Sequence, residues 1–123
     1  MQPYLSSYPH GLAFDANRNE VFVANEGSDT ISIISDASNR VIGNVTVSIS
    51  PASVAFDSHL SEVFVSNYDG GYGDTVSVIS DATNKVNGTI IVGNGPYGLA
   101  FDSNKNQIFV ANNVSGTVSV ISG

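Results

Sequence analysis

Residues 13–35, AFDANRNEVFVANEGSDTISIIS, decide the fold because the same pattern returns twice further along the chain. The second copy is residues 55–80, AFDSHLSEVFVSNYDGGYGDTVSVIS, and the third is residues 100–122, AFDSNKNQIFVANNVSGTVSVIS. The shared phenylalanines Phe22, Phe64 and Phe109 place consecutive copies 42 and then 45 residues apart. Repeats of this length are typical of β-propeller blades. The stretch therefore predicts a repeat protein made of β-strands.

Each full repeat is expected to contain four short strands. In the first repeat these are residues 11–15, 20–25, 31–35 and 41–49, and Asn, Asp, Ser and Gly mark the turns between them. No segment has apolar residues at sustained helical spacing, and Val, Ile, Phe and Thr favour strands. The first three strands are apolar on both sides, which is typical of blades covered by two neighbours. We therefore predict an all-β propeller of four-stranded antiparallel blades, with three blades in a single domain, residues 1–123.

The repeat boundaries fall at about residues 8–49, 50–94 and 95–123, and the third repeat stops after its third strand. Residues 1–7 stand before Pro9 where a fourth strand stands before Pro51 and Pro96, so we expect them to form the strand that completes a last blade. Three blades are too few for a ring, since propellers usually have about four to eight. We expect a homodimer that closes as a six-bladed ring by exchange of this N-terminal strand. A fragment of a longer propeller is the alternative.

The composition excludes several classes of partner. The net charge is -7 with only four basic residues, which argues against nucleic acid because phosphate binding needs Lys and Arg. The chain has no apolar run long enough for a membrane helix, so we expect no membrane insertion. It has no cysteine for a thiolate metal site, and we expect neither a cofactor nor a metal. Asp15-x-Asn17-x-Asn19 has the opening spacing of a calcium loop but lacks its Gly and distal Glu, so turn formation explains it better.

A candidate binding face comes from sorting the loops of a propeller between its two ends. Loops that join successive blades share one end with the loops between the second and third strands, whereas all four basic residues fall in turns at the other end. The candidate binding residues at the first end are Tyr8, His10, Tyr68, Asp69, Tyr72, Asp74 and Tyr97. Tyrosine is enriched in binding surfaces. Packing of Tyr8 and Tyr97 beside Pro9 and Pro96 is the alternative explanation for those two residues.

The repeat resembles a known family. Residues 98–122, GLAFDSNKNQIFVANNVSGTVSVIS, together with DATNKV at residues 81–86, are similar to the YVTN-type β-propeller repeat of archaeal surface-layer and bacterial secreted proteins. The Tyr-Val-Thr-Asn tetrapeptide of that family stands here as Phe-Val-Ala-Asn or Phe-Val-Ser-Asn. The resemblance implies a propeller fold and an extracellular or cell-surface setting. It places no catalytic motif on these residues, and the fold alone does not give a function.

Two kinds of function remain open at this stage. The first is a non-enzymatic binding or structural module that presents a Tyr-rich acidic loop face to a glycan or a basic protein. The alternative is a propeller enzyme of the lyase or lactonase type, with a metal or His10 at the ring axis. The loop at residues 67–75, three residues longer than its counterparts, is where we expect the working face, because insertions in repeats tend to lie there.

Overall fold

The computed structural model describes residue 3 and residues 8–122, and within them the chain forms eleven β-strands and one short 3-10 turn. The first sheet contains β1 (Pro9–Asp15), β2 (Glu20–Asn25), β3 (Thr30–Ser35) and β4 (Arg40–Thr46). The second contains β5 (Pro51–Asp57), β6 (Glu62–Asn67), β7 (Thr75–Ser80) and β8 (Lys85–Ile91), with the 3-10 turn η1 (Asp69–Gly71) before β7. The third contains β9 (Pro96–Asp102), β10 (Gln107–Asn112) and β11 (Thr117–Ser122).

Each sheet is a meander in which every strand pairs antiparallel with the next one along the chain. The prediction of antiparallel blades is therefore confirmed. The turn between the first two strands is closed as expected for an Asx turn, since Asp15 Oδ1 accepts from the backbone N–H of Asn17 at 2.9 Å and of Arg18 at 3.1 Å. The strand predicted at residues 41–49 ends at Thr46, because the following residues cross to the next blade.

The strand-ending asparagine of the repeat fastens each blade internally. Asn67 Nδ2 donates to Thr75 Oγ1 at 3.1 Å and to Ser77 Oγ at 2.9 Å, and both hydroxyls lie on the neighbouring strand β7. The equivalent residues Asn25 and Asn112 bind a Thr and a Ser in the same way. The motif Asn…Thr-x-Ser therefore recurs because one side chain satisfies two hydroxyl groups between adjacent strands.

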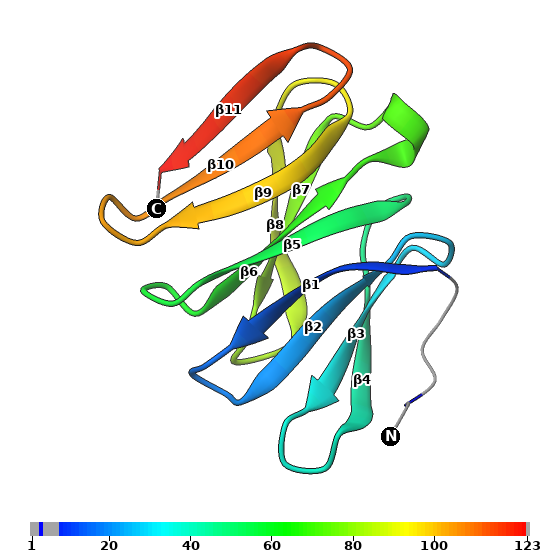
Figure 1. Ribbon diagram of the computed structural model, residues 1–123, viewed down its shortest axis with the longest axis vertical. Helices are drawn as coiled ribbons and strands as arrows, with labels where there is room; N and C mark the ends of the chain where they lie inside the picture. The colour runs from blue at the N-terminus through cyan, green and yellow to red at the C-terminus, as the bar shows by residue number, and fades with distance from the viewer. Residues whose placement is uncertain (1–2, 4–7, 123) are drawn as a thin grey trace.

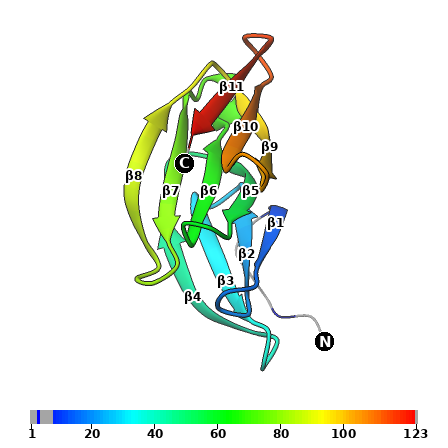
Figure 2. The same cartoon turned by 90° about the vertical axis from the view of Figure 1, so that its left-hand side faces the viewer.

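The three sheets are arranged as blades of a fan, with β1, β5 and β9 lying side by side on one side and β4 and β8 on the other (Figures 1 and 2). One core lies between the first and second blades and includes Phe22, Ile33, Val63 and Ile79. A second core lies between the second and third blades and includes Phe64, Val78, Ile108 and Val110. The middle blade is therefore buried on both faces, as the sequence predicted, and the two outer blades are each covered by a neighbour on one face only.

The third sheet has three strands within the described part of the chain, so β11 is its outer strand. In the other two blades a fourth strand, β4 or β8, lies further out. The predicted completing strand, residues 1–7, lies almost wholly outside the described residues, so its pairing stays a prediction. In the residues that are described, no helix is long and apolar enough to cross a membrane.

Candidate functional site

The loops predicted to share one end of the fold do lie together there. Each inner strand is entered through a residue with positive φ, namely Tyr8 (54°), Ser50 (55°) and Gly95 (65°). The carbonyl groups of these residues accept hydrogen bonds from Glu26, Tyr68 and Asn113, which start the loops after β2, β6 and β10. The same backbone contact thus joins the two kinds of loop in all three blades, and side chains from both kinds meet at this end.

Three of the candidate residues form a continuous aromatic cluster across the three blades. The rings of Tyr97 and Tyr68 meet edge to face with centroids 5.0 Å apart, and those of His10 and Tyr97 do so at 5.4 Å. Tyr97 Oη and His10 Nε2 are 2.8 Å apart. His10 is the second residue of β1 and Tyr97 is the second residue of β9, and the equivalent residue on the inner strand of the middle blade, between them, is the small Ala52. We call His10, Tyr68 and Tyr97 the aromatic cluster.

The two hydrogen bonds of His10 determine which of its ring nitrogens donates and which accepts. His10 Nδ1 is 3.0 Å from the carbonyl oxygen of Ala52, which can only accept, so this nitrogen carries the proton. In the neutral imidazole Nε2 is then the acceptor, and the Tyr97 hydroxyl donates to it. The free lone pairs of the Tyr97 oxygen remain as acceptors for a ligand donor. The cluster therefore offers an aromatic surface with an oriented hydroxyl group at its edge.

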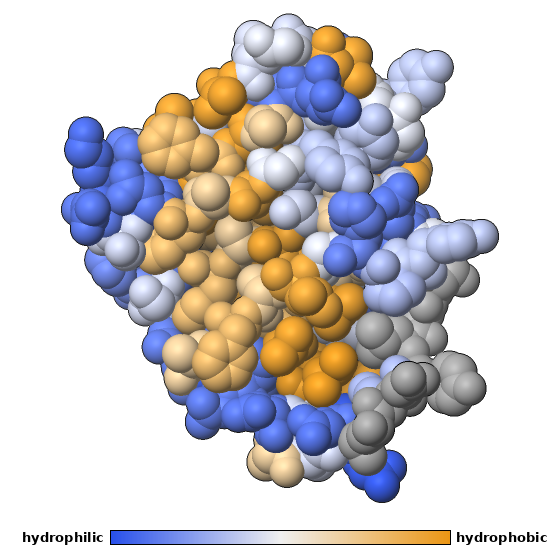
Figure 3. Space-filling view, in the orientation of Figure 1, coloured by the Kyte–Doolittle hydropathy of each residue, from blue (hydrophilic) through white to orange (hydrophobic). Residues whose placement is uncertain are grey.

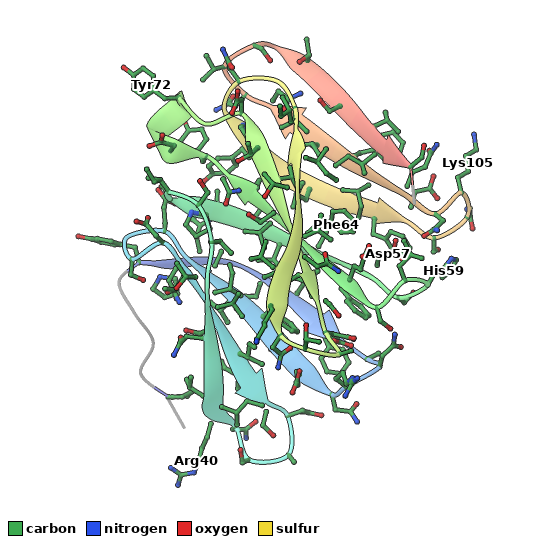
Figure 4. All side chains as sticks on the ribbon, turned by 180° about the vertical axis from the view of Figure 1, so that it is seen from behind. Arg40, Asp57, His59, Phe64, Tyr72 and Lys105 are labelled. Carbon is green, nitrogen blue, oxygen red and sulfur yellow. The ribbon has the colours of Figure 1, made fainter. Side chains whose placement is uncertain are left out.

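Hydrogen bonds within its own backbone fix the conformation of the inserted loop after β6. The N–H groups of Gly71 and Gly73 both donate to the Tyr68 carbonyl at 3.0 Å, and Tyr72 N–H donates to the Asp69 carbonyl at 2.9 Å. Gly70 and Gly71 have φ of 60° and 97°, a conformation that favours glycine. The turn leaves the Tyr72 side chain 89% exposed at the tip (Figure 4). Asp74, at the end of the loop, is exposed as well.

The remaining candidates do not join the aromatic cluster. Tyr8 and Tyr72 make no aromatic contact within the described residues, and Tyr8 is 78% exposed. Asp69 and Asp74 flank Tyr72 on the inserted loop, and the described part of the chain holds no group of three or more His, Cys, Asp or Glu that could bind a metal. The sequence placed all seven residues at one end. The structure brings three of them into contact, keeps Asp69, Tyr72 and Asp74 on the inserted loop, and leaves Tyr8 exposed.

A group of carboxylates at the opposite end escaped the sequence prediction. Asp15 ends β1 of the first blade and Asp81 follows β7 of the second blade, and both are buried. Burial, together with a hydrogen bond and repulsion from Asp81, raises the pKa of Asp15 from 3.8 to about 6. Burial also raises the pKa of the neighbouring Glu20. Arg18 Nε lies 3.9 Å from Asp81 Oδ1, too far for a strong charge-assisted bond. An Asp recurs at these turn positions in the repeat, but the residue spacing within a repeat does not predict that Asp15 of one blade approaches Asp81 of the next.

Comparison with known proteins supports the architecture. No family model and no curated protein matches the chain. Among solved structures, it superimposes on hydrazine synthase from Kuenenia stuttgartiensis with a TM-score of 0.84 and 17% identity over 93% of this chain. It also superimposes on a putative 6-phosphogluconolactonase from Bacteroides fragilis with a TM-score of 0.80 and 18% identity over 94% of this chain. The chain spans 34% and 35% of the lengths of those two proteins. With the meandering blades described above, these likenesses show a β-propeller-like fold.

Proposed function

We propose that the chain is a non-enzymatic propeller module that binds a neutral glycan at the end carrying the aromatic cluster and the loop of Tyr72. The observation that carries this proposal is the contact of His10, Tyr97 and Tyr68 across three blades. Tyrosine rings present apolar faces that stack on sugar rings, and their hydroxyl groups bond to sugar hydroxyls. Asp69 and Asp74 add acceptors for sugar O–H groups beside the exposed Tyr72 ring.

The charge distribution favours a neutral ligand over an anionic one. The four basic residues Arg18, Arg40, Lys85 and Lys105 all stand in or beside turns at the other end of the strands. Arg40 and Lys105 lie far from Tyr72 in Figure 4. An anionic sugar or a phosphate bound at this end would therefore lie near the carboxylates of Asp69 and Asp74 and meet none of the four basic side chains. The resemblance to YVTN-type repeats supports placing such a module outside the cell or on its surface.

An array of neutral oligosaccharides, followed by calorimetry with the sugar that binds, tests the proposal. Replacing Tyr68 or Tyr97 by Ala removes one ring of the aromatic cluster, and we expect affinity to fall about 10-fold or more. Leu60→Ala is the control, because Leu60 is 46% exposed in the turn after β5, at the opposite end. Unchanged affinity in both Tyr variants would contradict the site. Capture of a Lys-rich peptide instead of any sugar would contradict the ligand class.

A lactonase activity centred on His10 is the alternative function. It is supported by the position of His10 at the start of an inner strand and by the likeness to a putative 6-phosphogluconolactonase. A phosphorylated substrate needs cations, and none of the four basic residues is at this end. Hydrolysis of a panel of sugar lactones, lost in His10→Gln, would establish this activity in place of simple binding.

A further inference from the structure

Within residue 3 and residues 8–122, the two outer blades each leave one apolar sheet face uncovered. On the third blade, the exposed fractions are 36% for Phe109, 62% for Val118 and 51% for Val120. On the first blade, Leu12 is 64% exposed and Phe14 is 52% exposed. Hydrophobic residues form a band over the side on which β9, β5 and β1 lie in Figure 1 (Figure 3). Soluble monomers rarely expose apolar surface in large contiguous patches, so these faces require an occupant.

The repeat identifies what each uncovered face is shaped to bind. Phe64, Val76 and Val78 of the middle blade occupy the repeat positions of Phe109, Val118 and Val120, and they are 3%, 0% and 6% exposed because the third blade covers them. Val54 and Phe56, which occupy the repeat positions of Leu12 and Phe14, pack against the first blade. The free face of the third blade is therefore the kind of face that receives a following blade. The free face of the first blade is the kind that covers a preceding one.

We propose that a second copy of this chain covers both faces, the first blade of each copy packing on the third blade of the other to close a ring of six blades. A two-fold axis satisfies this arrangement, because each copy supplies one face of each kind to the other. Three blades from each of two copies give six, within the usual range for propellers of about four to eight. This inference concerns assembly and is independent of the proposed glycan site.

The turn residues are complementary in charge across the proposed junction. Arg18 of the first blade faces Asp81 of the second at 3.9 Å. Lys105 occupies the repeat position of Arg18 on the third blade, and Asp36 occupies that of Asp81 on the first. Packing of blade on blade in the same way brings Lys105 of one copy to Asp36 of the other. The two cations at this turn position thus meet carboxylates at two junctions, one within the chain between the first and second blades and one between copies, and Leu60 holds the position at the junction between them.

A second polar contact repeats at the same end. With its amide nitrogen turned toward the second blade, Asn106 donates to Asp57 Oδ1 at 3.1 Å and to Oδ2 at 2.9 Å. Asn19 occupies the repeat position of Asn106 and has nearly the same φ, 55° against 54°. Asp102 occupies that of Asp57 but is partly exposed, whereas Asp57 is 1% exposed. The proposed junction pairs Asn19 of one copy with Asp102 of the other and completes the burial of this carboxylate.

The buried area is sufficient for a stable dimer. Strands of six or seven residues are about 20 Å long, and three to four strands about 4.8 Å apart are roughly 14–19 Å wide. Each face therefore covers roughly 300–400 Å², and closing both junctions buries about 600–800 Å² on each copy. This approaches the roughly 800 Å² per partner of a standard interface. A partner on one face alone would bury half as much, which favours closure of both faces by one second copy.

Light scattering on the 123-residue chain tests this assembly, and we expect about twice the chain mass of 12.8 kDa. Val118→Lys places a charge in both junctions and should weaken the dimer at least about 100-fold, while the separated chain keeps its fold because Val118 is exposed there. Ile91→Lys is the matched control. Ile91 is 79% exposed on the middle blade, which already has both neighbours, so this variant should stay dimeric.

A charge exchange tests the register of the junction. Lys105→Glu should weaken the dimer about 2- to 10-fold, since two exposed ion pairs become repulsive, and Asp36→Lys in the same chain should restore it. A monomer at all concentrations would overturn the proposal, and so would a nine-bladed trimer or an open polymer. A dimer that Val118→Lys leaves unchanged, or a charge exchange that does not restore affinity, would overturn the assigned faces.

Discussion

Replacing Asp81 by Asn should stabilise the protein at alkaline pH and leave it nearly unchanged at acidic pH. Asp15 has an ordinary pKa of 3.8 in the unfolded chain and a pKa of about 6 in the fold, where it faces Asp81. Since the folded pKa is the higher one, the folded state holds the proton more tightly. The stabilising contribution is therefore complete below about pH 4, and it is lost as pH rises through about 6.

The size of the effect follows from the shift. A rise of about two pKa units corresponds to about 3 kcal/mol between protonated and ionised Asp15, of which burial supplies the largest part. Asp81 supplies the rest through a hydrogen bond and repulsion, so we expect Asp81→Asn to recover about 1–2 kcal/mol at pH 8. The loss of the 3.9 Å contact with Arg18 reduces this gain only in part, because the contact is long and the Arg18 side chain is half-exposed, and ion pairs with such exposure contribute about 1 kcal/mol at most.

Urea denaturation at pH 4.5 and pH 8, followed by tyrosine fluorescence, measures these free energies, since the chain has five Tyr and no Trp. Asp74→Asn is the control, because it removes the same charge from an exposed position and so reports the effect of net charge alone. All variants are compared at one protein concentration, since assembly would make stability concentration-dependent. The reasoning is refuted if the gain from Asp81→Asn at pH 8 does not exceed that from Asp74→Asn.

Three further predictions concern the stability of a blade, the packing of adjacent blades and the affinity of the dimer. Asn67→Ala should lower the free energy of unfolding by about 2 kcal/mol in the same urea assay, because it removes two hydrogen bonds to hydroxyls of β7, the buried one of Ser77 and the partly buried one of Thr75. Gly11→Ala should lower the midpoint of thermal unfolding, since an added Cβ would stand 2.6 Å from the Ala52 carbonyl oxygen and force the first two blades apart. Removing residues 1–6 should weaken the dimer in light scattering if they supply the completing strand, and an unchanged dimer would exclude that role.

The repeat made the blades predictable because their strands are determined locally. Asp15 closes its turn with its own neighbours, and Asn67 bonds to the next strand, so the spacing of these residues within one repeat was enough. The contacts between blades were harder to foresee. The aromatic cluster depends on the small Ala52 between His10 and Tyr97, and the carboxylate pair depends on the rotation of one blade against the next. Sequence periodicity gives the positions on a blade, but this rotation is set by the packing of two apolar faces.

The position of the aromatic cluster connects the binding proposal with the proposed assembly. The aromatic cluster lies where the inner strands β1 and β9 begin, and in a closed ring these strands surround the axis. Two copies would place two aromatic clusters around one opening, so a ligand that reaches both would bind more tightly than one that reaches a single cluster. The two proposals can nevertheless fail separately. Val118 lies on a blade face and acts on assembly, whereas Tyr68 is on a loop at the end of the fold and acts on binding. A monomer that still binds a single sugar would contradict the six-bladed ring and support the binding site.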